Sequence, residues 1–149
     1  MSKPFPLQAV LDLMQTRTDD AARELGKLIA QEQDAKARLC LLEDYRNEYG
    51  NRFRAAAQQG LSPLQWQNFQ DFLGKLDEAI QHQQRLVDAS ADRTAAGQRS
   101  WLEQRNKVQA FDTLAQKHEA KERYAEGRQD QKRADEFSAR KFRDAQDEE

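Results

Sequence analysis

Hydrophobic residues in the first part of the chain recur at spacings that alternate between four and three. The series runs Leu7, Leu11, Met14, Thr18, Ala21, Leu25, Leu28, Glu32, Ala35, Leu39, Leu42, Arg46, Tyr49, Phe53 and Ala56. Only Thr18, Glu32 and Arg46 interrupt the apolar pattern. This spacing puts every member on one stripe of an α-helix, and a stripe sustained over so many turns is typical of a coiled coil. The pattern predicts a helical arm over about residues 6–59.

A second series with the same alternation begins at Trp66. Its members are Trp66, Phe69, Leu73, Leu76, Ile80, Gln83, Val87, Ser90, Thr94, Gly97, Trp101, Gln104, Val108, Phe111 and Ala115. We call the positions of both series the seam. The second series predicts another helical arm, over about residues 63–140.

The stretch between the two series carries signals that end one helix and begin the next. Gly60 can adopt the left-handed backbone conformation that closes a helix. Ser62 and Gln65 have the spacing of a capping box, and Pro63 suits the first helical position. Because these signals follow one another closely, we expect a turn at residues 60–62 and two antiparallel arms. The alternative is a kink between two helices that do not pair.

Folding the chain at this turn brings complementary seam residues together. The register gives these pairs: Ala21 with Trp101, Leu25 with Gly97, Ala56 with Trp66, Thr18 with Gln104, Glu32 with Ser90, Phe53 with Phe69, Leu42 with Ile80, and Leu11 with Phe111. Small residues face large ones, polar residues face polar ones, and the remaining large residues face each other, as close packing requires. Arg46 falls opposite Leu76, and we expect its side chain to extend toward water.

The predicted fold is all-α, a single domain over residues 1–149. It is a long antiparallel two-helix coiled-coil hairpin whose C-terminal helix overhangs. The middle of the seam is expected to bury little and to bend or fray; it comprises Glu32, Ala35, Ser90, Thr94 and Gly97. The tail, residues 116–149, lacks a partner arm and carries many charges of both signs. We expect it to be partly disordered until a partner orders it; the alternative is an inert solvated tail.

Composition narrows the class of protein. The chain is 34% charged and 38% hydrophobic, which suits a helical pair better than a thick globular core. A net charge of −2 argues against a nucleic acid or an acidic membrane as partner. No apolar run is long enough to span a membrane, and the N-terminus lacks the apolar region of a signal peptide. These features predict a cytoplasmic protein without direct membrane insertion.

The sequence offers no recognisable catalytic chemistry. It contains no phosphate-binding loop, no nucleophile motif and no metal-ligand spacing, so no cofactor or metal is expected. We expect His82 and His118 on exposed faces, and Cys40 as an inert, half-buried residue beside the seam. A two-helix hairpin also lacks the concave pocket that enzymes use, so an enzyme is not expected.

An apolar strip flanks the seam near the turn. Tyr45, Phe72, Ala79 and Leu86 each directly precede a seam position, where charged residues are usual. In antiparallel arms these positions lie on the same side, with the seam residues Leu42, Tyr49 and Leu76 beneath them. We call these seven residues the ridge. Two interpretations stay open: a locally wider core, or a surface that binds a partner.

At these residues the sequence resembles the FliJ family of flagellar type III export proteins. The matching stretches are Asp20–Arg23, Asp44–Tyr49, Trp66–Leu73 with Leu76, Ala79 and Ile80, Ser100–Trp101, Gln109–Leu114 and Glu126–Phe137. Together they span nearly the whole chain with consistent spacing. The resemblance implies a non-enzymatic stalk like that of a rotary ATPase, placed in the hexameric export ATPase and promoting its ring assembly. It also implies contacts with the cytoplasmic linker of the export gate and with export chaperones.

The resemblance further implies where these contacts fall. The family's gate-binding strip matches Leu42, Tyr45, Tyr49, Phe72, Leu76 and Ala79, which all belong to the ridge. Candidate contacts with the ATPase fall in the tail at Arg128, Asp130, Gln131, Lys132, Asp135 and Phe137. The protein is then expected in the cytoplasm and peripherally at the cytoplasmic face of the inner membrane.

Other functions compete with a stalk. A simple adaptor that escorts export chaperones would use the same hairpin with no mechanical role. The stalk of a virulence-type secretion system would resemble this sequence closely. A helical arm that grips nucleic acid is disfavoured by the balanced charge.

Overall fold

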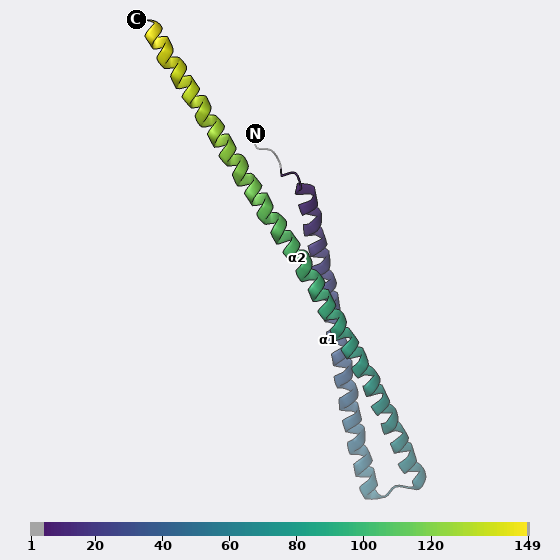
Figure 1. The fold of residues 1–149 in the computed structure, drawn as a ribbon. Helices are drawn as coiled ribbons and strands as arrows, with labels where there is room; N and C mark the ends of the chain where they lie inside the picture. Colours follow the sequence, from purple (N-terminus) through teal and green to yellow (C-terminus); the bar gives the residue numbers. More distant parts are fainter. Residues whose placement is uncertain (1–4, 149) are drawn as a thin grey trace. The chain divides into compact units, whose positions relative to one another are not determined.

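The computed structural model describes residues 5–148 and contains two long helices. Helix α1 spans Gln8–Gln59 and helix α2 spans Pro63–Asp147. Residues 5–148 contain no strand. Figure 1 shows the two helices joined by one short turn, with α2 returning alongside α1. The all-α antiparallel hairpin predicted from the seam is confirmed.

The turn has the local chemistry that its residues predict. Gly60 has φ 96°, in the left-handed region, and its N–H donates to the Ala57 carbonyl over 3.2 Å. The Ser62 N–H donates to Gln65 Oε1 over 3.0 Å, and the Gln65 N–H donates to Ser62 Oγ over 3.2 Å. This reciprocal pair is the predicted capping box, and α2 starts at Pro63, immediately after Ser62.

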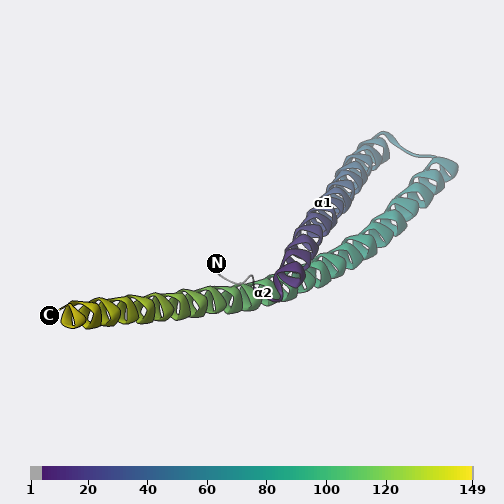
Figure 2. The same cartoon turned by 90° about the horizontal axis from the view of Figure 1, so that it is seen from above.

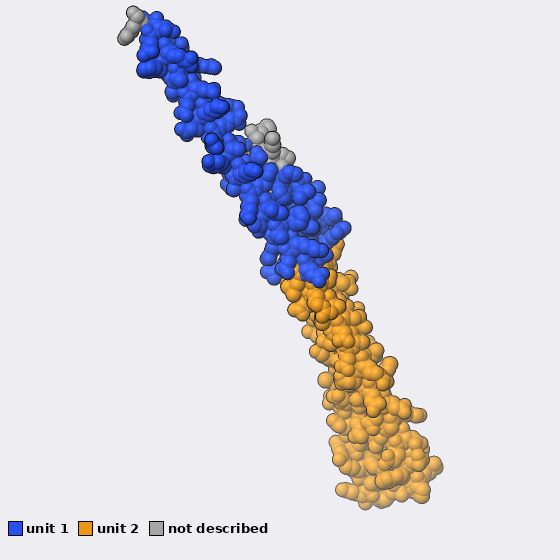
Figure 3. Space-filling view, in the orientation of Figure 1, with its two compact units in different colours: residues 1–18, 103–149 blue, residues 19–102 orange. Residues whose placement is uncertain are grey.

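The chain divides into two compact units, coloured separately in Figure 3. One unit comprises residues 19–102, which include the turn. The other comprises the beginning of the chain up to residue 18 and the second part of α2 from residue 103. In the first unit, α1 and α2 run beside each other in the two views of Figure 1 and Figure 2.

Within the unit of residues 19–102, side-chain contacts establish the predicted register. The rings of Phe53 and Phe69 lie 5.3 Å apart between centroids. A methyl group placed on Gly97 would meet Leu25 Cδ1 at 3.6 Å and Leu28 Cδ1 at 2.7 Å. Leu25 therefore packs against the helix surface at Gly97, as predicted, and the two backbones approach closely there. All seam positions are buried or half-buried except Leu7 and Trp66.

The prediction that the middle of the seam buries little is wrong for Ser90, which has 5% of its surface exposed, whereas Glu32, Ala35, Thr94 and Gly97 are half-buried. Gln83 and Val87, the two seam positions before Ser90, are also buried, with 9% and 7% exposed. Arg93 Nη2 donates to Ser90 Oγ over 3.0 Å within α2, whereas Gln83 reaches the backbone of α1. Gln83 Nε2 donates to the Ala35 carbonyl over 3.0 Å. Small neighbouring residues let the helices approach, so these polar groups are enclosed and form hydrogen bonds. Bending or fraying of this zone stays a prediction.

Glu32 and Thr94 form a second polar contact in the same zone. The Thr94 hydroxyl lies 3.3 Å from the Leu28 carbonyl oxygen and also faces the Glu32 carboxylate, so its one proton is shared between two acceptors. Hydrogen bonding from Thr94, and secondly from Lys36, lowers the pKa of the Glu32 carboxyl. The Lys36 ammonium lies 3.3 Å from Glu32 Oε1. The charged form of Glu32 is therefore favoured in the folded hairpin.

In the other unit, the beginning of α1 packs against α2 until the seam ends. Leu11 is the most buried apolar residue here, with 3% of its surface exposed. The Phe5 ring lies 5.6 Å from that of His118, which is half-buried. Beyond this contact α2 continues past residue 140 to Asp147, and residues 127–148 are exposed throughout. The C-terminal helix thus overhangs as predicted, whereas partial disorder of the free tail stays a prediction.

Replacing two glycines by alanine should shift stability in opposite directions. Gly60→Ala should destabilise the hairpin by about 1 kcal/mol, because alanine is strained at positive φ. Gly74→Ala should stabilise it by about 0.5–1 kcal/mol, because Gly74 lies inside α2 with open space around its Cα. Urea unfolding followed by circular dichroism measures both changes. Shifts of the same sign would contradict this account of the turn.

The free energy of unfolding should depend on pH partly through Glu32. Its pKa is lowered by folding, so its stabilising effect is complete above the ordinary carboxyl pKa and is lost as the pH falls below about 4. The variant Glu32→Gln should therefore lose less stability than the original chain over this acid range. Urea unfolding at a series of pH values tests this. Glu24→Gln, at an exposed position, is the control and should follow the original chain.

Candidate partner-binding surface

Aromatic residues from both helices meet beside the seam near the turn. The Tyr45 ring on α1 and the Phe72 ring on α2 have centroids 6.1 Å apart and planes at 84°. Tyr49 contacts Phe72 and Phe69, with centroid distances of 4.5 Å and 5.3 Å. Edge-to-face and tilted contacts of this kind hold the rings in fixed positions. The structure therefore brings the aromatic residues of the predicted ridge together.

Members of the ridge differ in how accessible they are. Tyr45 and Leu86 are exposed, with 44% and 43% of their surfaces accessible. Phe72 and Ala79 are half-buried, as are Leu42 and Tyr49 beneath them. Leu76 is buried, with 7% of its surface exposed, and forms part of the core between the helices. Tyr45 is thus the most accessible aromatic side chain of the ridge.

One exposed residue next to the ridge was missed from the sequence. Leu41 has 69% of its surface accessible and precedes Tyr45 by four residues. Residues four apart are neighbours on a helix surface, so Leu41 extends the exposed apolar area along α1. Its spacing of four residues from Tyr45 was the sequence feature that could have indicated this exposed apolar neighbour. It was overlooked although Leu41, like Tyr45, directly precedes a seam position, Leu42.

Arg46 forms an ion pair that sequence reasoning did not anticipate. Its Nε donates to Asp77 Oδ1 over 2.9 Å, which joins α1 to α2, and this hydrogen bond raises the pKa of Arg46. Asp77 directly follows the seam residue Leu76, so the pair lies on the flank opposite the ridge. Both side chains are substantially exposed, so the pair contributes about 0.2–1 kcal/mol.

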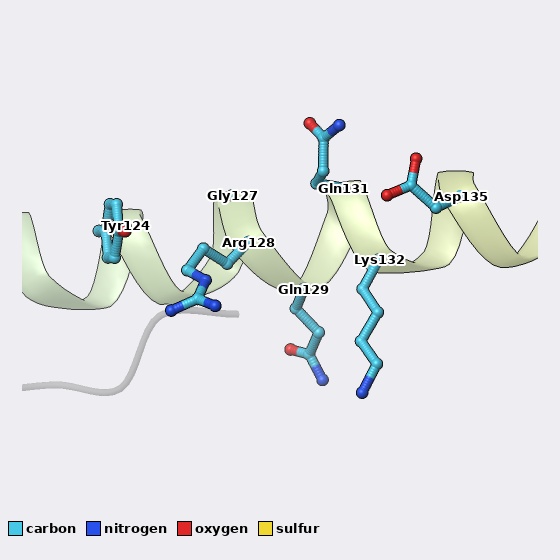
Figure 4. Close-up of a pocket in the computed structure, with 7 residues that line it drawn as sticks. All are labelled: Tyr124, Gly127, Arg128, Gln129, Gln131, Lys132 and Asp135. Atoms are coloured by element: carbon cyan, nitrogen blue, oxygen red, sulfur yellow. The ribbon is translucent and has the colours of Figure 1, made fainter.

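The candidate ATPase contacts do not share one face of the tail. Arg128, Asp130, Gln131, Lys132, Asp135 and Phe137 are all exposed. Figure 4 shows Gln131 and Asp135 on one side of the helix and Lys132 projecting from the other. Helical spacing places Asp130 and Phe137 on the face away from Gln131 and Asp135. A partner that contacts the whole set would have to surround the helix.

Two aromatic residues of the tail, Tyr124 and Phe137, are each covered by a cation one turn later. Arg128 Cζ lies 6.0 Å from the centre of the Tyr124 ring, and both residues appear in Figure 4. Lys141 Nζ lies 5.6 Å from the centre of the Phe137 ring. Such contacts contribute about 0.5–1 kcal/mol each at exposed sites and support an unpartnered helix locally.

The side chains with catalytic potential are dispersed. Within residues 5–148, no group of three or more His, Cys, Asp or Glu side chains is arranged to hold a metal ion. His82 is exposed, as predicted, but His118 is half-buried beside Phe5. Cys40 is exposed, so the expectation of a half-buried thiol is wrong. No helix in this part of the chain is long and apolar enough to cross a membrane.

Comparison with known proteins identifies the family. The family model described as the flagellar FliJ protein matches residues 2–147. The chain belongs to the FliJ family. The flagellar FliJ protein of Escherichia coli (strain K12) is 35% identical over 140 residues, covering 94% of this chain and 95% of the relative. That of Salmonella typhi is 33% identical over 140 residues, with the same coverage. FliJ membership therefore applies to both helices and to the tail.

Proposed function

We propose that this FliJ-family chain is the non-enzymatic stalk and coupling protein of the flagellar type III export apparatus. In this role it promotes assembly of the hexameric export ATPase and contacts the cytoplasmic linker of the export gate and export chaperones. The family assignment supports the flagellar apparatus over a virulence-type secretion system. The observation that supports the coupling role is that one chain has two different surfaces. One is the aromatic ridge near the turn, and the other is the charged helix without a packing partner at the C-terminus.

The ridge has the composition of a protein-binding surface. Exposed Tyr45 and Leu41 lie beside half-buried Phe72, and interface hot spots are enriched in aromatic side chains held in fixed positions. We assign the export-gate contact to this surface. Leu42, Tyr49 and Leu76 support the ridge from beneath, and Ala79 leaves room for a partner side chain.

The exposed end of α2 suits a partner that encloses it. Residues 127–148 carry charges of both signs on all faces of the helix. Their side chains are exposed and have no packing partner in the described chain. An ATPase ring would surround the helix, which agrees with the candidate contacts lying on different faces. The protein would then act in the cytoplasm and at the cytoplasmic face of the inner membrane.

Removing the ridge side chains should weaken gate binding without unfolding the hairpin. The double variant Tyr45→Ala with Phe72→Ala should lower affinity for the purified gate linker by at least about tenfold, because hot-spot residues contribute about 2 kcal/mol each. Calorimetry measures the affinity, and ATPase stimulation should persist. Unchanged affinity would show that the ridge only packs the hairpin.

A matched pair of leucines sharpens this test. Leu41 and Leu64 are almost equally exposed, at 69% and 71%, but only Leu41 adjoins Tyr45. Leu41→Ala should reduce gate affinity, whereas Leu64→Ala should not. Equal losses would mean that the effect is nonspecific.

Truncating the tail should separate a stalk from an adaptor. A chain ending at residue 126 keeps the seam but lacks the part of α2 that is exposed throughout. The full chain should promote hexamer formation by the ATPase in analytical ultracentrifugation. The truncated chain should do so at least several-fold less, while still binding the gate linker. If the full chain does not change the oligomeric state of the ATPase, the adaptor hypothesis replaces the stalk.

A further inference from the structure

Four aliphatic side chains in the unit of residues 5–18 and 103–148 remain exposed near one another. Leu7, Val10 and Leu13 come from the N-terminal arm, with 43%, 39% and 50% of their surfaces accessible, and Leu114 of α2 is 50% accessible. Val10 and Leu114 each directly precede a seam residue, so in antiparallel helices they lie on the same flank. Leu13 follows Val10 by three residues and widens the same surface.

Basic residues border these aliphatic side chains. Arg17, Lys107 and Lys121 lie seven residues from Val10 or Leu114 and so occupy the same flank, and Lys117 follows Leu114 by three residues. All four are exposed. The ion pairs found within residues 5–148 involve other side chains. We call these four basic residues, with Leu7, Val10, Leu13 and Leu114, the basic–aliphatic face.

Three carboxylates of the same unit lie on the other side of the seam. Asp112, Glu119 and Glu122 line a groove there, together with Gln8 and Gln15 of α1. The groove and the basic–aliphatic face thus lie on different sides of the seam. The net charge of −2 for the whole chain conceals this separation. The charge of the whole chain therefore does not describe the charge that one flank presents to an acidic membrane.

We propose that the basic–aliphatic face adsorbs to a bilayer surface that carries anionic lipid. Aliphatic side chains enter the boundary between headgroups and acyl chains, and neighbouring lysines reach the lipid phosphates with their long side chains. Juxtaposed basic residues are attracted to anionic lipid over about one Debye length. This adsorption is independent of the stalk role and needs no membrane-spanning segment.

The chemistry of the face favours lipid over a protein helix. Protein–protein hot spots are enriched in Trp, Tyr and Arg, whereas Leu and Val are under-represented. The basic–aliphatic face offers leucine, valine and mostly lysine, in contrast to the aromatic ridge. The groove of this unit, where a helix would be received, carries carboxylates and lies on the other flank.

Vesicle sedimentation with the full-length chain tests the proposal. The protein should bind vesicles of phosphatidylcholine mixed with phosphatidylglycerol, and not vesicles of phosphatidylcholine alone. Binding should weaken as ionic strength rises. The double variant Lys107→Glu with Lys121→Glu should lower the partition coefficient more than about tenfold, because each basic charge near the surface contributes about fivefold. Circular dichroism verifies that the helices remain.

Control variants identify the surface and the apolar contribution. Lys27→Glu with Arg99→Glu makes the same charge change at exposed positions of the other unit and should leave binding within about twofold. Leu13→Gln should weaken binding without changing charge, whereas Leu64→Gln, at another exposed leucine, should not.

Several outcomes would overturn the proposal. They are no binding to the phosphatidylglycerol vesicles, equal losses in the two charge variants, or unchanged binding of Leu13→Gln. If the vesicles remain unbound and a synthetic amphipathic peptide of glutamate and leucine binds the face instead, the face docks a protein helix and the lipid assignment is wrong.

Discussion

Close approach of two antiparallel helices along the seam is the constraint on which the rest of the structure depends. Gly97 offers no side chain, so Leu25 and Leu28 pack against the backbone of α2. At the other end of the same unit, Phe53 and Phe69 fill the space between the helices. Size complementarity at each level holds one register, because a shift would bring large residues together and leave gaps elsewhere. The turn sets this register, since its capping box fixes where α2 begins.

A hairpin of two helices can enclose only one narrow stripe, so most of its chemistry stays on the surface. This explains why function in such a protein depends on the flanks of the seam. Near the turn the flanking positions carry aromatic residues from both helices, and in the other unit they carry aliphatic and basic residues. Positions that directly precede a seam residue therefore form two surfaces of different chemistry in one chain.

Polar residues in the seam have a structural role that their hydropathy does not reveal. Gln83 donates to the Ala35 carbonyl, and Thr94 donates to the Leu28 carbonyl. These bonds can form only where both helices are in register, and a buried polar group without a partner is costly. The polar layer therefore disfavours other registers.

Both helices, the turn between them, the seam and its register could be predicted from the sequence, because these follow from local periodicity and capping chemistry. It also placed Tyr45 and Phe72 on one flank and indicated the family. The depth at which each residue lies could be read only from the packed helices. Gln83 and Ser90 are enclosed, Cys40 and Leu41 are exposed, His118 lies against Phe5, and Arg46 pairs with Asp77. Periodicity tells which way a side chain points, whereas its burial depends on the size of the residues opposite and on the distance between the helices.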